Sequence, residues 1–316
     1  MKQLSKERQD EYVRIAYYYY IAGFTQEQIA GKMQISRQKV NRILSQCIEL
    51  GIVEIHIKDY EKSYVEIETE LELKYGLKAV RITGMVTVEN ASILLGQTAA
   101  QYLATVIQEN DVIGFSRGLA MSSLAGNLSY ANCERLTVTQ LMGSWNSQQS
   151  GITVDDIVHR AAQNMGAATT MLYAPAVVNS KELRNSIMYE PYFKEAYKVI
   201  RSCKIAAVGI GRMQPAIYND IPLMSESEYG LYCDKNAVGE ICGHFFDSKG
   251  NPVITEFDER TIVISREDYM KIPLRIGVAG GEPLKLPAIR GALKGGYINM
   301  LVTDLNTANE LLKEES

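Results

Sequence analysis

The chain has 316 residues, of which 46% are hydrophobic, and a formal net charge of −4 with a pI of about 5.6. This size predicts two domains with a sizeable core, and the acidic balance excludes a polybasic coat for nucleic acid. No apolar run is long enough to span a bilayer and the first residues are polar throughout, so we expect no membrane partner and a cytoplasmic location.

Cysteine and histidine usage gives no sign of a disulfide framework or a metal site. The cysteines are scattered without a CxxC pair, and the histidines have no ligand spacing. We therefore expect reduced thiols, no metal and no cofactor. The residues concerned are Cys47, Cys133, Cys203, Cys233, Cys242, His56, His159 and His244.

Residues 5–22 are expected to form the first helix, with Ser5 as N-cap and Gly23 at its end. Four consecutive tyrosines, residues 17–20, stand near its C-terminal end. Consecutive side chains cover the whole circumference of a helix, so core packing accounts for only some of them. For the others we expect a subunit contact, because tyrosine is favoured in interface cores; a phosphate contact by one hydroxyl is the alternative.

Residues 25–51 are predicted to form two short helices joined by a tight turn. Thr25 suits the N-cap of the first helix, and Gln28 three residues on allows a capping box. Ser36 suits the N-cap of the second helix, which Gly51 ends. The spacing of apolar residues predicts that the two helices pack against each other, which is typical of a helix-turn-helix.

The second of these helices presents a polar face that fits the major groove of DNA. Residues 1–58 hold nine Lys+Arg against six Asp+Glu, or +3, which leaves −7 for the rest of the chain. We predict a DNA-binding domain over 1–58, the alternative being a solvated basic helix pair. Its modest charge predicts that homo-oligomerisation, as a dimer or tetramer, multiplies the affinity for operator DNA. The predicted DNA-binding residues are Thr25, Gln26, Ser36, Arg37, Gln38, Lys39, Asn41, Arg42 and Ser45.

The pattern changes after Gly51. Residues 52–57 alternate with period two, which predicts a strand that would form a small wing. Residues 59–63 are the expected linker. The second domain, 64–316, is expected to bind an effector and to oligomerise, and it opens with a helix over 64–75.

From Ala79 onward short apolar strands alternate with helices, which is typical of an α/β fold with a parallel, Rossmann-like sheet. Helices are expected over 91–108 and 154–165, among others. The expected strands are 79–82, 112–115, 136–141, 169–172, 205–208, 261–264, 276–279 and 300–302.

Ligands in such sheets bind at the carboxyl ends of the strands. Three loops with glycine and small residues, 114–118, 141–146 and 278–285, follow predicted strands there. Small residues let backbone N–H groups approach an anion at a helix N-terminus, and two cations add charge. Together the loops predict a phosphate-bearing effector. The predicted binding residues are Gly114, Ser116, Arg117, Gly118, Gly143, Ser144, Gly280 and Lys285.

Two acidic residues farther along, Glu240 and Asp247, are candidates to accept hydrogen bonds from sugar hydroxyls. Asp247 also suits an ordinary turn in the sequence DSKG, and composition does not separate the two interpretations.

The first loop also matches the G-x-S-x-G motif of serine hydrolases. A hydrolase would need an acid and a later histidine at loop ends. His159 follows two aspartates on one helix turn, and His244 lies in an apolar segment. A sugar-phosphate isomerase or deaminase suits the loops better, but no general base is evident. We therefore predict no catalytic residues.

These motifs make the chain similar to the SorC family of bacterial transcriptional regulators, the sorbitol/sorbose-operon type. The similarity runs from residue 15 to the final helix. It is carried by TQEQIAGKMQISRQKVNRIL, DVIGFSRGLAMSSL, VGIG at 208–211, AVGEICGHFFDSKG and RIGVAGGEPLKLPAIRGALKGGYINMLVTD. The last block is the most distinctive.

The resemblance implies a non-catalytic domain related in fold to glucosamine-6-phosphate deaminase and ribose-5-phosphate isomerase. It also implies a sugar-phosphate effector and a dimer-of-dimers on operator DNA, with an unphosphorylated polyol or ketose as the alternative effector. By motif, phosphate would be held by Ser116, Arg117, Gly118 and Lys285, and hydroxyls by Glu240 and Asp247.

The sequence departs from the family pattern at two places. Arg117 stands where relatives often have an aromatic or small residue, and the block 280–285 is one residue longer than in some relatives. Some relatives attach their sugar to a lysine near the second loop, but residues 140–150 contain none, so no Schiff base is expected.

Overall fold

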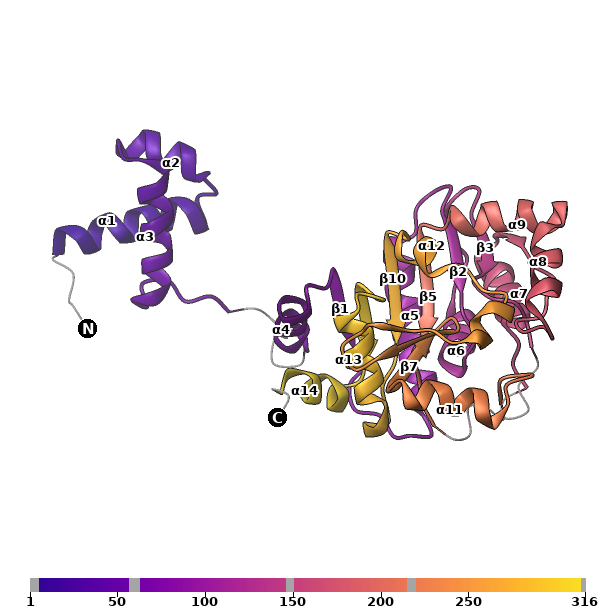
Figure 1. Ribbon diagram of the computed structural model, residues 1–316. Helices are drawn as coiled ribbons and strands as arrows, with labels where there is room; N and C mark the ends of the chain where they lie inside the picture. The colour runs from indigo at the N-terminus through magenta and orange to yellow at the C-terminus, as the bar shows by residue number, and fades with distance from the viewer. Residues whose placement is uncertain (1–5, 57–62, 146–150, 215–219, 314–316) are drawn as a thin grey trace. The chain divides into compact units, whose positions relative to one another are not determined.

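The computed structural model describes residues 6–56, 63–145, 151–214 and 220–313. The chain divides into two compact units, Met1–Ser63 and Tyr64–Ser316 (Figure 1). Within the described ranges, no helix is long and apolar enough to cross a membrane.

The smaller unit is helical. Its buried core is formed by apolar side chains from the three α-helices, among them Ile15, Ile29 and Val40. Its elements are α1 (Lys6–Ala16), the π-helix η1 (Tyr17–Ile21), α2 (Gln26–Met33) and α3 (Arg37–Glu49).

Local hydrogen bonds fix the ends of α2 and α3 as the sequence predicts. Thr25 and Gln28 form a reciprocal capping box at α2, and the Ser36 hydroxyl accepts the N–H of Lys39 at α3. Gln34, between the helices, is left-handed with φ +53°, and Gly51 after α3 has φ +70°. Replacing an N-cap residue such as Thr25 or Ser36 by alanine lowers helix stability by about 1 kcal/mol.

The first predicted helix is present but ends as a π-helix, and its predicted N-cap Ser5 lies outside the described residues. Tyr18 stacks on Phe24 with ring centroids 5.5 Å apart. Tyr17, Tyr19 and Tyr20 remain 55%, 37% and 38% exposed. The expectation that only some of the four tyrosines pack in the core is therefore confirmed.

The predicted strand over 52–57 is wrong for residues 52–56, which form no strand. The N–H groups of Ile52 and Val53 both bond to the carbonyl of Cys47 at 2.9 and 3.0 Å. The chain therefore folds back over the end of α3. Residues 57 and 59–62, on which the end of that strand and most of the linker fall, lie outside the described residues.

The larger unit is built on a seven-stranded parallel sheet in the order β1-β11-β10-β5-β2-β3-β4. Figure 1 shows several of these strands side by side. The sequence predicted all seven, with small differences at their ends. The bounds are β1 (Ala79–Ile82), β2 (Val112–Phe115), β3 (Thr137–Gln140), β4 (Ala168–Thr170), β5 (Ile205–Gly209), β10 (Leu274–Val278) and β11 (Met300–Thr303).

Helices cover both faces of this sheet, because alternate side chains of each strand point to opposite sides. Leu301 of β11 belongs to the buried cluster that includes residues of helices α4, α9, α13 and α14, whereas Met300 and Val302 belong to the cluster that includes residues of α5, α6 and α7. The bounds are α4 (Val65–Tyr75), α5 (Ala91–Val106), α6 (Leu119–Asn127), α7 (Val154–Met165), α9 (Pro191–Arg201), α13 (Leu286–Lys294) and α14 (Leu305–Leu312).

A second, antiparallel sheet was not predicted from the sequence. It comprises β6 (Gly211–Arg212), β7 (Ala237–Ile241), β8 (His244–Asp247) and β9 (Pro252–Val253). It packs on α13, with Gly239 against Ala288 and Gly291 against Phe246. The remaining elements are α8 (Lys181–Tyr189), α11 (Glu226–Asp234), η3 (Glu256–Arg260), α12 (Arg266–Met270) and η4 (Pro283–Lys285).

The predicted strand over 261–264 is wrong. Thr261 and Val263 form only isolated bridges, to Val177 and Met142 respectively. The segment nevertheless runs beside the stretches of chain that follow β3 and β4.

The turn after β8 generates a prediction about stability. Gly250 has φ +82°, and a Cβ there would lie 2.1 Å from the backbone nitrogen of Gly295. Gly250→Ala should therefore lower the free energy of unfolding by more than about 1 kcal/mol. Gly230→Ala is the control, because that glycine is inside α11 with open space around it, and alanine should stabilise the helix by up to about 1 kcal/mol. Urea unfolding of both variants measures the difference, and equal effects would contradict the packing described.

Candidate functional site

A cavity of about 410 Å³ lies at the carboxyl ends of the parallel strands. From β2 the chain adds β3 and β4 on one side, and then crosses to place β5 on the other side. Ligands of open α/β sheets bind at such a point, where the strand order reverses. The second sheet contributes Glu240, Cys242 and Phe245 to the opposite wall.

The loop from β2 to α6 forms the part of the cavity at this reversal point. The Ser116 hydroxyl accepts the N–H of Gly209 at 3.0 Å and so joins the ends of β2 and β5. Gly118 precedes α6 with φ +145° and makes no side-chain cap. The first N–H groups of α6 have no acceptor within the helix, and the helix dipole adds positive potential there. This geometry suits an anion.

Arg117 stands beside this helix end with its guanidinium already engaged. It forms an ion pair with Asp220 and lies 4.4 Å above the ring of Trp145. Both partners line the same cavity. The indole N–H of Trp145 is buried and has no hydrogen-bond partner among the described residues.

Two further cations enter the cavity from the ends of β5 and β10. Arg212 pairs with Glu282, Nε to Oε2, at 3.2 Å. Lys285 lines the same wall, and no carboxylate of the described residues lies within ion-pair distance of it. Of these three cations, Lys285 is therefore the one without a carboxylate partner among the described residues.

Glu240 lines the wall formed by the second sheet. Its Oε2 accepts the N–H of Gly243 at 2.9 Å. Burial raises the pKa of the carboxyl, while this hydrogen bond and the charge of Arg117 act in the opposite direction. A carboxylate in this position suits acceptance of hydrogen bonds from ligand hydroxyls.

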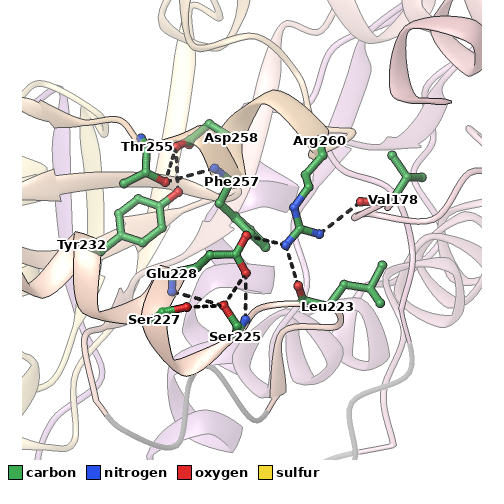
Figure 2. Close-up of polar contacts among 10 residues, drawn as sticks. All are labelled: Val178, Leu223, Ser225, Ser227, Glu228, Tyr232, Thr255, Phe257, Asp258 and Arg260. Carbon is green, nitrogen blue, oxygen red and sulfur yellow. Dashed lines mark hydrogen bonds and ion pairs between the residues drawn. The ribbon is translucent and has the colours of Figure 1, made fainter. Parts of the chain in front are cut away.

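A polar network holds the other end of the cavity together (Figure 2). Arg260 donates to the carbonyls of Val178 and Leu223 at 3.1 and 2.6 Å and to Glu228 at 2.7 Å. Its guanidinium also lies 4.5 Å above the ring of Phe257, which lines the cavity. Burial raises the pKa of Glu228, but hydrogen bonds from Arg260 and Ser225 outweigh it, so the net shift is downward.

The structure brings half of the ten predicted effector-binding residues to this cavity. These are Ser116, Arg117, Gly118, Glu240 and Lys285.

It places the other predicted residues elsewhere. The glycines pack against neighbours: Gly114 on Leu141, Gly143 on the Pro175 backbone and Gly280 on Asp304. Ser144 forms an isolated bridge with Pro175.

The structure does not bring Asp247 to the cavity. Its carboxylate accepts the N–H groups of Lys249 and Asn251 at 2.9 and 2.8 Å and so caps the turn after β8. These hydrogen bonds lower its pKa, although burial acts the other way. The turn interpretation of DSKG is therefore the one that the geometry supports.

Several residues that line the cavity were not selected from the sequence. Arg212 follows the GIG segment after β5, and Glu282 lies inside the third predicted loop, so their positions after strands were a usable signal. Trp145 is the only tryptophan of the chain. Asp220 and Phe257 carried no sequence signal, because only the tertiary fold brings them to the cavity.

In the smaller unit, α3 presents an exposed polar face. Ser45 lies there with its hydroxyl donating to the Asn41 carbonyl at 3.2 Å, and the Asn41 amide accepts from Gln26 at 3.3 Å. Lys39 instead pairs with Glu11 of α1 at 3.0 Å and turns away from this face. The exposed members are Arg37, Gln38, Asn41, Arg42 and Ser45.

The part of the chain that forms the parallel sheet and its cavity also matches a known domain family. Residues 60–313 match the sugar-binding domain family Sugar-bind.

Individual relatives extend the similarity to nearly the whole chain. The sorbitol operon regulator of Klebsiella pneumoniae is 34% identical over 310 residues, which cover 95% of this chain and 97% of the relative. The deoxyribonucleoside regulator of Bacillus subtilis (strain 168) is 28% identical over 314 residues, which cover 98% of this chain and 100% of the relative. The crystal structure of the full-length sorbitol operon regulator SorC from Klebsiella pneumoniae matches with a TM-score of 0.74 and 30% identity, over 98% of this chain and 100% of that one.

The chain belongs to the SorC family of transcriptional regulators, and residues 60–313 are its sugar-binding domain. The relatives are named as regulators, so the protein is a regulator and not an enzyme.

Removing the Arg260 guanidinium should loosen the wall that carries Phe257. Arg260→Ala removes the donor to Oε1 of Glu228 and to the carbonyls of Val178 and Leu223, and it should lower the free energy of unfolding by about 1–3 kcal/mol. Lys181→Ala is the control, because its pair with Glu259 is about half exposed and should contribute less than about 1 kcal/mol. Chemical denaturation compares the two. A loss at Arg260 no larger than that at Lys181 would show that the network does not stabilise this wall.

Proposed function

We propose that the protein regulates a carbohydrate-utilisation operon and that a phosphorylated sugar controls its affinity for operator DNA. The observation that carries the proposal is the convergence of the α6 N-terminus, Arg117, Arg212 and Lys285 on one cavity. A helix N-terminus with nearby cations suits a phosphate group, and Glu240 opposite it suits a sugar hydroxyl.

The smaller unit supplies the DNA-binding function in this proposal. Two capped helices with a tight turn, and an exposed face carrying Arg37, Asn41 and Arg42, suit insertion of α3 into the major groove. Arginine and asparagine are side chains that read base edges there. This supports a helix-turn-helix assignment for residues 1–58 and an effector domain over 64–316.

Control of DNA binding requires that the effector favour one quaternary arrangement over another. A differential binding free energy of a few kcal/mol is sufficient for such a switch. We propose a homo-oligomer, a dimer or tetramer, because a domain with a charge of only +3 gains operator affinity when two copies bind together. The exposed Tyr17, Tyr19 and Tyr20 suit a contact between copies.

Arg37→Ala and Arg42→Ala test the DNA-binding face. Each should weaken binding by about 1–3 kcal/mol, the usual contribution of an arginine that contacts a base. Fluorescence anisotropy measures this on DNA that the wild-type protein selects from a random-sequence pool. Arg160→Ala, on an exposed position of α7, is the matched control and should bind normally. If both α3 variants also bind normally, α3 is not the recognition helix.

Lys285→Ala tests the effector site. A thermal-shift panel that pairs each sugar with its phosphate should identify stabilising phosphates for the wild type, and the variant should lose this stabilisation but keep its DNA affinity. Lys194→Ala, an exposed lysine on α9, should behave as wild type. Equal stabilisation by a sugar and its phosphate would point instead to an unphosphorylated polyol or ketose, and an unchanged response would remove Lys285 from the site.

A further inference from the structure

The smaller unit has an apolar groove of about 540 Å³ that the proposed DNA contacts do not use. The end of α1 and the π-helix η1 form one wall, which carries Val13, Tyr17 and Ile21. The chain that follows α3 forms the other wall, which carries Ile52 and Ile55. Segments that precede and follow the helix-turn-helix in the sequence therefore meet at one surface.

The side chains of this groove are exposed although they are large and apolar. Ile21 is 73% exposed, Ile55 57%, Tyr17 55% and Val13 49%. Because they line one groove, they form a contiguous patch and are not scattered over the surface. Contiguous apolar patches on a small domain mark sites of contact with another molecule.

The second wall also has backbone groups that the chain does not use. The N–H groups of Ile52 and Val53 bond to the carbonyl of Cys47, whereas the backbone groups of residues 54–56 bond to no described residue. The alternating sequence of residues 52–57 is typical of a strand, but no described segment pairs with residues 52–56. This wall therefore offers both apolar side chains and backbone hydrogen bonds to a partner.

The charge of the groove excludes DNA as its occupant. No lysine or arginine lines it, and Glu54 and His56, whose Oε2 and Nε2 lie 3.9 Å apart, are its only ionisable residues besides the tyrosines. A phosphate backbone requires cations. Arg37 and Arg42 of the exposed α3 face do not line the groove, so α3 can contact DNA while the groove binds something else.

We infer that the groove is a two-fold contact between the DNA-binding units of two copies of the chain. The inference rests on the proposed function, because it requires the smaller unit to bind DNA. A two-fold contact brings a patch against itself, so the patch must contain both a recess and protruding side chains. The groove is the recess, and the exposed Ile21 and Tyr17 protrude at its wall.

Charge also favours a second copy. The groove has one carboxylate and one histidine, so little like charge opposes the contact of the patch with itself. Residues 1–58 carry only +3, so one unit attracts DNA weakly and gains from a second unit held beside it. The contact would then set the spacing of the two α3 helices and hence of the operator half-sites.

Cysteine cross-linking of the full-length protein tests the contact directly. Ile21→Cys should give a covalent dimer with a bis-maleimide, and mass spectrometry should find the peptide with residue 21 joined to an identical peptide. Such a pair can come only from two copies. Gly31→Cys is the matched control, because Gly31 is exposed on α2 outside the groove and should give no such pair. The exposed Cys233 is replaced by serine in both variants.

Operator binding gives a second measurement, on DNA that the wild type selects from a random pool, either intact or with one half-site scrambled. Ile21→Glu and Ile55→Glu each place a carboxylate in the groove, one on each wall. Each should weaken binding to the intact DNA by at least about tenfold and leave binding to the single half-site unchanged, because only the intact DNA holds two units in contact. Ile48→Glu is the matched control, since Ile48 is 47% exposed outside the groove, and it should preserve the ratio of the two affinities.

The outcomes separate this inference from the proposed function. Absence of the paired residue-21 peptides, or an unchanged affinity ratio in both groove variants, would overturn the inference while DNA selection by the wild type still supported the proposed function. A link from residue 21 to another segment of the same chain alone would identify a different occupant and would also overturn it. If the wild type selects no DNA, the proposed function fails and the inference fails with it.

Discussion

Parallel pairing of β2 with β5 places two loops that are far apart in the sequence at one point. The hydrogen bond from the Gly209 N–H to the Ser116 hydroxyl fixes that point, because it joins the ends of the two strands directly. The turn into α6 and the turn into β6 both line the cavity. The cavity opens between them, so its position follows from strand order more than from any single binding residue.

The second sheet gives this open edge its other wall. Its strands are short; α13 packs on them, and Tyr232 of α11 stacks on Phe245 of β8. Arg260 contacts the loop after β4, the segment before α11 and the α11 helix itself, so one side chain sets the spacing between the two walls (Figure 2). A rigid spacing of this kind favours selection by shape, because little of the wall must be ordered when a ligand binds.

The sequence predicted the parallel sheet because buried parallel strands are nearly continuous apolar runs, which differ clearly from amphipathic helices. It did not predict the second sheet, since β6 and β9 are only two residues long and β7 contains a glycine. The segment 261–264 has the composition of a strand but pairs only through single bridges. Local pattern does not distinguish these cases, because they depend on tertiary neighbours.

The same limit applies to the site. Ser116, Arg117 and Lys285 were accessible from the sequence because they follow strands in loops with glycines. Gly114 and Gly280 also fit that pattern, but each is a glycine because a neighbouring side chain leaves no room for a Cβ. Asp220 and Phe257 reach the cavity only through the fold, and no local pattern of residues marks them.

The two arginines of the cavity carry carboxylate partners within the chain, Asp220 for Arg117 and Glu282 for Arg212. An anion that binds either arginine must displace its carboxylate partner. The free energy gained is therefore only the difference between the new ion pair and the old one. A simple monoanion such as chloride cannot form the bidentate hydrogen bonds that an arginine makes to a carboxylate, so it gains little by displacing one. A phosphate ester, with three oxygens and a sugar that fills the remaining space, offers more. Under the proposed function, these two ion pairs disfavour binding of the common small anions at Arg117 and Arg212.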